Sequence, residues 1–174
     1  MSEVVFGIDP GSVVTGYGVI SQEGGRLRYL DCGVIKSPSR LDFPERLRRI
    51  HSGLVAAIEE ASPDSVAVES VFHAKHASSA LKLGQARGVA LLAAAQAEKP
   101  IHEYAPAQVK RAVTGNGRAD KEQVRQMVET LLGRKIDLPA DATDALAVAI
   151  CHAHASPLAE ALAEAGRRGR GRRR

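Results

Sequence analysis

The chain has 174 residues, of which 44% are hydrophobic and 25% are charged. This size and composition fit one globular domain with one sizeable core, and they exclude a disordered or fibrous protein. The net charge of +4 comes from six arginines in residues 167–174, because the rest of the chain has 18 basic and 20 acidic residues. The basic pI therefore belongs to the C-terminal tail and not to the body.

The sequence also bears on the compartment. No apolar run approaches the length of a membrane span, and the N-terminus lacks a basic segment leading into an apolar signal core. The two cysteines, Cys32 and Cys151, suggest no disulfide framework. We therefore expect a cytoplasmic protein without a membrane partner.

The first predicted elements are strands. The apolar run Val4–Ile8 predicts a central strand that ends on the carboxylate of Asp9. Asp9-Pro10-Gly11 is also ordinary turn chemistry, so this segment alone does not identify a site. Residues 14–20 and 26–35 predict two further strands joined by a glycine turn. Apolar residues at helical spacing predict an amphipathic helix over roughly 43–61.

The second half of the chain predicts alternating strands and helices. Residues 65–69 form a short apolar strand that ends on Glu69, as the first strand ends on Asp9. A long helix to about residue 97 and a short strand at 101–104 follow. Helices are predicted at 107–113, from residue 120 to Gly133, and from Pro139 to about residue 154. Ser156-Pro157 predicts a break before one more short helix.

This order predicts a ribonuclease H-like α/β fold. Three strands form an antiparallel meander, two more add to it in parallel, and helices flank the mixed five-stranded sheet. We assign residues 1–156 to one domain with this ribonuclease H-like fold. Residues 157–174 form a short helix and an Arg-rich tail, which we expect to be disordered and to attract polyanions without specificity.

Four carboxylates are the candidate catalytic groups. Right-handed crossovers place the ends of the strands carrying Asp9 and Glu69 side by side at one sheet edge. Asp141 and Asp144 lie one turn apart at the start of a helix, where acids also serve as caps. Four clustered anions require a cation, and oxygen ligands favour Mg²⁺ or Mn²⁺. Two such ions are the usual apparatus of phosphodiester hydrolysis.

Four motifs carry a family resemblance over roughly residues 3–155. In order and spacing they resemble the RuvC family of crossover junction endodeoxyribonucleases: Gly7–Gly11, Val68–Phe72, Tyr104–Lys110 and Asp141–Ala147. The resemblance implies a homodimer that nicks two opposing strands of a four-way (Holliday) DNA junction symmetrically, during recombination and repair. It places the four acids on metal-binding positions, although some relatives have histidine at the position of Asp141. It also implies RuvA and RuvB, the junction-binding and branch-migration proteins, as partners.

The middle of the chain carries the candidate DNA contacts. Residues 70–121 hold eight lysines and arginines against three acids. Lys110 and Lys121 match basic positions near the family's active site, so we assign them with the acids to catalysis. Phe72, in a loop, is a candidate for stacking on an unpaired base, or else a core residue. The other candidates for phosphate contact, which could equally form a solvated face, are Lys75, Lys82, Arg87, Arg111 and Arg118.

Two other features are less specific. Gly84 and Gly88, four apart on the long helix, permit close approach by another backbone, and in the family this helix lies at the dimer interface. Intrachain packing would need the same small residues. Cys151, His152 and His154 do not share a helix face, which disfavours a metal site.

Three other functions share part of this pattern. The segment from Asp9 to Gly16 also resembles the phosphate loop of the actin and sugar-kinase ATPases, but these need two such domains. A catalytically inactive nucleic-acid-binding relative would not need all four acids. The related small nuclease family that acts on ribosomal RNA lacks the segments 69–72 and 104–110 as they stand in this sequence.

Overall fold

The computed structural model describes residues 2–70, 77–135, 137 and 139–171, with side chains up to residue 155. The elements follow the predicted order of three strands, a helix, a strand, a helix, a strand and three helices. Their bounds are β1 Glu3–Asp9, β2 Val14–Glu23, β3 Arg26–Lys36, α1 Phe43–Ala61, β4 Ser65–Glu69, α2 Ala77–Gln96, β5 Ile101–Tyr104, α3 Pro106–Thr114, α4 Lys121–Leu132 and α5 Ala140–Gly171.

The five strands form one mixed sheet in the order β3-β2-β1-β4-β5. β1 pairs with β2, and β2 with β3, in antiparallel fashion. β4 joins β1 and β5 in parallel. The predicted meander with two added parallel strands is therefore confirmed. It places the ends of β1 and β4 side by side, because Ile8 faces Val68 across the pair.

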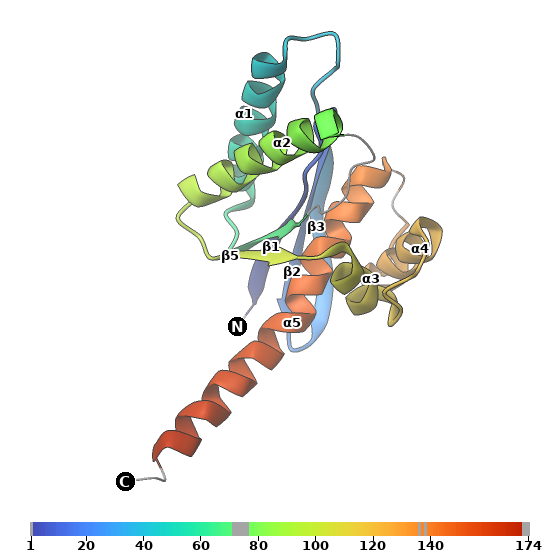
Figure 1. Ribbon diagram of the computed structural model, residues 1–174. Coiled ribbons are helices and arrows are strands. Elements are labelled where there is room, and N and C mark those ends of the chain that lie inside the picture. The colour runs from blue at the N-terminus through green and yellow to red at the C-terminus, as the bar shows by residue number, and fades with distance from the viewer. Residues whose placement is uncertain (1, 71–76, 136, 138, 172–174) are drawn as a thin grey trace.

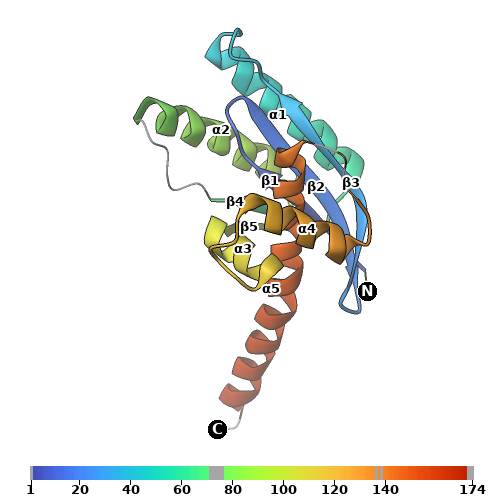
Figure 2. The same ribbon diagram turned by 90° about the vertical axis from the view of Figure 1, so that its right-hand side faces the viewer.

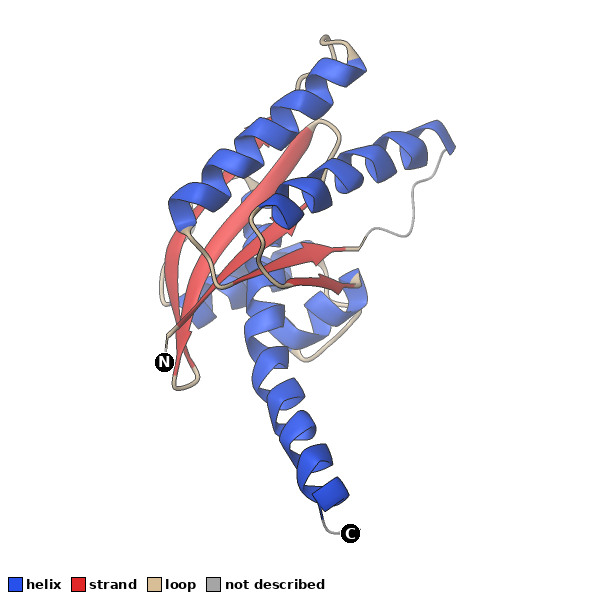
Figure 3. Ribbon diagram, turned by 90° about the vertical axis from the view of Figure 1, so that its left-hand side faces the viewer, coloured by secondary structure: helices blue, strands red, loops and turns tan. Residues whose placement is uncertain are grey.

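Helices cover both faces of the sheet (Figure 1). On one face α1 and α2 enclose a core that includes Phe6, Ile50 and Leu54. On the other face α5 runs across the sheet and encloses a second core with Val5 and Leu146. Figure 2 shows α3 and α4 beside each other next to α5, and Figure 3 shows the sheet between the two helical layers. Both faces of the central strands β1 and β4 are thus buried, as their continuous apolar sequences predict.

Glycines let α5 lie directly against the strands. A Cβ atom on Gly16 would collide with the carbonyl oxygen of Asp141, and one on Gly7 with that of Ala145. Only residues without a side chain allow this approach of helix and strand backbones. The N-terminal turn of α5 is consequently held above the end of β1, where Asp9 lies.

The predicted break at Ser156-Pro157 is wrong. α5 is one continuous helix from Ala140 to Gly171 and extends beyond the sheet (Figure 1). The residues that follow the proline are mainly alanine, leucine and glutamate, whose high helix propensity favours continuation. The division of the chain at residue 156 stays a prediction. In the part of the chain that the structure describes, no helix combines the length and apolar character needed to cross a membrane.

Candidate active site

Carboxylates from two strands and one helix line a single cavity. Asp9 is the last residue of β1, and Glu69 is the last residue of β4. The two are joined by Asp144 of α5 in lining a cavity of about 240 Å³. The predicted convergence of strand ends is therefore present in the fold.

Asp141 lies at the margin of this cluster. It is in the first turn of α5, where the helix dipole favours a carboxylate. It does not appear among the lining residues of the cavity, but its charge still acts on Asp9, more weakly than the charge of Asp144. The two acids of α5 thus differ in position: Asp144 faces the cavity and Asp141 flanks it.

Two lysines line the same cavity as the carboxylates. Lys110 of α3 and Lys121 of α4 both line it. Nζ of Lys121 lies 3.1 Å from Oδ2 of Asp144, although 80% of the lysine side chain remains exposed. This hydrogen bond and the charge of Asp144 raise the pKa of Lys121. Both lysines that the sequence ranked first therefore meet the carboxylates.

Burial, and after it the repulsion between neighbouring carboxylates, makes these acids hold protons more tightly. Burial, and next the charges of Glu69 and Asp144, raise the pKa of Asp9 from 3.8 to about 8. Burial also raises the pKa of Glu69, against the lowering effect of its hydrogen bond with Asp9 and of the nearby lysines. A protonated Asp9 that donates to an ionised Glu69 accounts for both directions.

The side chains around the cavity are suited to a divalent cation. Among the described residues no three histidine, cysteine or acidic side chains converge closely enough to form a ready-made metal site. The carboxylates instead line a cavity, and the pKa of Asp9 is raised first by burial and next by the charges of Glu69 and Asp144, a repulsion that a cation would relieve. The acidic ligands present are all oxygens, which suit a hard divalent ion. The residues therefore fit such an ion, with Asp9, Glu69 and Asp144 nearest to it.

The raised pKa of Asp9 predicts a pH dependence of stability without metal. Between pH 3.8 and about 8 the folded state keeps a proton that the unfolded chain releases, so stability falls as pH rises. Asp9→Asn removes this effect. We expect the variant to be more stable than the wild type by roughly 1–3 kcal/mol at pH 8, and by less at pH 4.

Urea denaturation in EDTA at a series of pH values measures this difference. Asp42→Asn is the control, because Asp42 is exposed and its side chain caps no helix hydrogen bond. Parallel curves for the wild type and Asp9→Asn across this pH range would contradict the assignment. Adding Mg²⁺ at pH 8 should stabilise the wild type more than the variant.

The remaining predicted DNA contacts are spread over the surface. Lys82, Arg111 and Arg118 are exposed. Arg87 instead forms an ion pair with Glu103 of β5 and is partly buried, so its guanidinium already has a structural partner. Phe72 and Lys75 lie outside the described residues. The roles of these six residues in binding DNA stay predictions.

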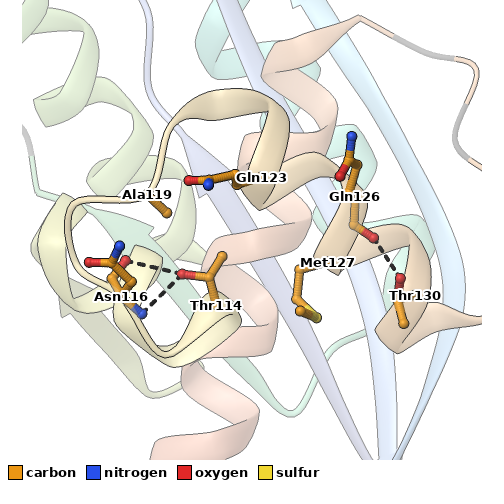
Figure 4. Close-up of a pocket in the computed structure, with 7 residues that line it drawn as sticks. All are labelled: Thr114, Asn116, Ala119, Gln123, Gln126, Met127 and Thr130. Atoms are coloured by element: carbon orange, nitrogen blue, oxygen red, sulfur yellow. Dashed lines mark hydrogen bonds between the residues drawn. The ribbon is translucent and has the colours of Figure 1, made fainter.

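A larger cavity of about 360 Å³ lies along α4. Figure 4 shows it between α4 and the loop that precedes it, lined by neutral side chains such as Asn116, Gln123 and Met127. These groups offer hydrogen bonds but neither a nucleophile nor a cluster of charges. The chemistry therefore belongs to the smaller cavity, where acids and lysines face one another.

Sequence reasoning missed the glycine contacts that hold the site together. The alternation of Gly16 and Gly18 along β2 reads as a weakened strand, yet both positions face α5. Glycine within a strand often marks close approach of another backbone. This signal was available, but the sequence alone does not say which element approaches.

Comparison with known proteins agrees with these features. The sequence profile of the family described as "Crossover junction endodeoxyribonuclease RuvC" matches residues 5–152. RuvC of Geobacter sp. (strain M21) is 54% identical over 159 residues, which cover 91% of this chain and 97% of the relative. RuvC of Vibrio campbellii is 52% identical over 160 residues, or 92% of each chain.

Solved structures extend the comparison to the fold. Thermus thermophilus RuvC in complex with a Holliday junction substrate has a TM-score of 0.84 and 38% identity, covering 90% of this chain and 96% of that one. The yeast mitochondrial Holliday junction resolvase Ydc2, with a TM-score of 0.62 and 14% identity, shares the fold. The chain belongs to the RuvC family of crossover junction endodeoxyribonucleases.

Proposed function

We propose that this protein is a Holliday junction resolvase that makes paired nicks in four-way DNA junctions by metal-dependent phosphodiester hydrolysis. The observation that carries the proposal is the cavity in which Asp9, Glu69 and Asp144 face Lys110 and Lys121. The family membership supports it, and a RuvC of Thermus thermophilus has been solved with a Holliday junction substrate.

The carboxylates would hold the metal. Asp9, Glu69 and Asp144 are the inner candidates, and Asp141 is the outer one. We propose two Mg²⁺ ions per active site, with Mn²⁺ as a substitute, on the basis of the oxygen donor set. When bound, such ions activate the attacking water and stabilise the charge on the leaving oxygen.

The lysines would act on the DNA and on the carboxylates. Lys110 lines the cavity together with the acids, where its charge would offset that of the scissile phosphate. Lys121 holds Asp144 through its hydrogen bond and would fix the orientation of that carboxylate. Lys75, Lys82, Arg87, Arg111 and Arg118 are the proposed contacts to phosphates farther away, and Phe72 is the proposed stacking residue.

Substitution of Lys121 should lower the cleavage rate without preventing metal binding. We expect Lys121→Ala to slow cleavage by about 10–100-fold, because Asp144 loses its partner and the phosphate loses a nearby cation. Stabilisation of the protein by Mg²⁺ should persist, since the carboxylates remain. Single-turnover cleavage and thermal melts with and without Mg²⁺ measure the two effects. Lys99→Ala, at an exposed turn, is the matched control, and unchanged kinetics in Lys121→Ala would contradict its role.

The proposed assembly is a homodimer through α2. Leu81 and Leu92 are 69% and 53% exposed on this helix. A Cβ added at Gly84 or Gly88 would meet open space in the single chain, so a second helix can approach there. Two copies would supply the two active sites that paired nicks require. RuvA and RuvB, the proposed partners, rest on the family resemblance alone. The proposed cytoplasmic location is supported by two free cysteines.

The test gives purified protein a synthetic four-way junction beside a linear duplex of the same sequence, with Mg²⁺ or with EDTA. We expect paired nicks in the junction with Mg²⁺, little cutting of the duplex, and no cutting in EDTA. Equal cutting of both DNAs would contradict the junction specificity. Tight junction binding without cleavage would instead favour a catalytically inactive binding protein.

A further inference from the structure

Two histidines near the middle of α5 hold the segment that carries Lys110. They are His152 and His154, and each makes a hydrogen bond to the stretch formed by β5 and α3. They lie two residues apart and point in different directions, so they reach two separate parts of that stretch. The proposed chemistry of the carboxylate cavity does not use either of them.

His152 holds the end of β5 through a hydrogen bond with Tyr104. Its side chain is 3% exposed, and its Nδ1 lies 2.7 Å from the hydroxyl of Tyr104. Its Nε2 lies 3.5 Å from Oε1 of Glu3, which also accepts a hydrogen bond from Ser65. In a neutral ring with the proton on Nε2, Tyr104 donates to Nδ1 and Nε2 donates to Glu3. Burial lowers the pKa of His152, which favours this neutral form.

His154 anchors the end of α3. Its Nδ1 lies 3.1 Å from the carbonyl oxygen of Ala112, so the ring N–H donates to that carbonyl. Ala112 is in the last turn of α3, where helix carbonyls lack partners within the helix. The histidine therefore satisfies an exposed end of α3 and ties it to α5.

The stretch between the two anchored points lines the carboxylate cavity through Pro106, Val109 and Lys110. The backbone N–H of Ser70, the residue after Glu69, donates to the carbonyl of Tyr104 at 2.8 Å. Two residues after Tyr104 the chain enters α3, which places Lys110 on the cavity wall. α5 thus carries Asp144 at its start and holds the lysine side of the cavity through its histidines.

We propose that His152 and His154 are positioning residues that set Lys110 opposite the carboxylates. A displacement of about 1 Å at a reacting centre can cost on the order of a hundredfold in rate. The loss of one of two anchors should therefore slow cleavage by about tenfold. This inference rests on the proposed cleavage reaction and deepens it.

Double-mutant cycles with Lys110 test the proposal. We expect His154→Ala to lower the single-turnover rate about tenfold at saturating junction, with the dissociation constant within about twofold of the wild type. Lys110→Ala should cost more, and the double variant should be no slower than Lys110→Ala, because the histidine acts through the lysine. His154→Asn should restore most of the rate, since its amide N–H can take the place of Nδ1–H.

The buried histidine needs a milder variant, because His152→Ala opens a cavity and could unfold the protein. Tyr104→Phe removes only the hydroxyl that donates to His152, and we expect it to behave as His154→Ala does. His51→Ala is the matched control: His51 also makes one side-chain hydrogen bond between elements, to Gln96 at 2.7 Å, but on the α1–α2 face. This control should retain the wild-type rate.

Three results would overturn the proposal: a wild-type rate in His154→Ala, losses that multiply with that of Lys110→Ala, or an equal loss in His51→Ala. A further measurement, made without DNA, tests the position of Lys110 independently of cleavage. In labelled protein the NMR signals of the Lys110 side chain should shift in His154→Ala and return in His154→Asn, and unshifted signals would contradict the inference. Cleavage that survives in Asp9→Asn would instead contradict the proposed reaction and leave this structural readout intact.

Discussion

Asp9→Asn is expected to abolish junction cleavage, with a loss on the order of a thousandfold, equivalent to about 4 kcal/mol of transition-state stabilisation. Asp9 is the group on which the charges of Glu69, Asp144 and Asp141 all act, so it lies at the centre of the carboxylate cluster. Asparagine keeps the size and one oxygen of the side chain but cannot supply a charged ligand. The variant should bind the junction in EDTA about as tightly as the wild type, because without metal Asp9 holds a proton below about pH 8 and its replacement changes little charge.

The measurement is single-turnover cleavage in Mg²⁺ together with junction binding in EDTA. Asp31→Asn is the matched control, because Asp31 is likewise an acid with a side-chain hydrogen bond, accepted from Tyr17, but it lies on the edge strand β3. We expect this control to cleave at the wild-type rate. Full activity in Asp9→Asn would remove Asp9 from the metal site and contradict the proposed mechanism.

The fold could be predicted because each strand has an unambiguous pattern. The short apolar strand 65–69 and the strand 101–104 come after helices, which requires parallel crossovers, whereas the glycine turn before β3 requires a hairpin. The interior of α5 was misjudged for a physical reason. Proline predicts a break, but Ala, Leu and Glu around Pro157 favour helix. A rule that considers one residue at a time does not balance the cost of the proline against the helix propensity of its neighbours.

The site could be predicted only in part. The convergence of Asp9 with Glu69 follows from strand topology, and the approach of Asp144 follows from the start of α5 near that edge. The difference between Asp144 and Asp141 does not follow from their spacing, since it depends on how α5 is rotated against β1 and β2. The ion pair of Arg87 with Glu103 was also missed. It joins α2 to the edge strand β5, and the sequence does not show which face of the helix turns toward that strand.

Gly16→Ala should damage the protein as severely as a change in a ligand. The added Cβ would collide with the carbonyl oxygen of Asp141, which is backbone and cannot rotate away. α5 must then shift from the sheet at the turn that carries Asp141 and Asp144. We expect a loss of roughly 1–3 kcal/mol in the free energy of unfolding from this overpacking. Because both acids move, we also expect a loss of about a hundredfold in cleavage rate.

Gly53→Ala distinguishes this mechanism from a general effect of adding a methyl group. Gly53 lies in α1, and its added Cβ would meet only the side-chain atoms of Ile35, which can adjust. Alanine also has a higher helix propensity than glycine, by about 1 kcal/mol, which offsets the crowding, so stability and rate should stay near the wild type. Urea denaturation, Mg²⁺ titration by thermal melts and single-turnover cleavage measure both variants. A Gly16→Ala protein with a wild-type rate and metal response would show that α5 can shift without moving its carboxylates. That result would contradict our inference that the direct contact between α5 and β2 places Asp141 and Asp144.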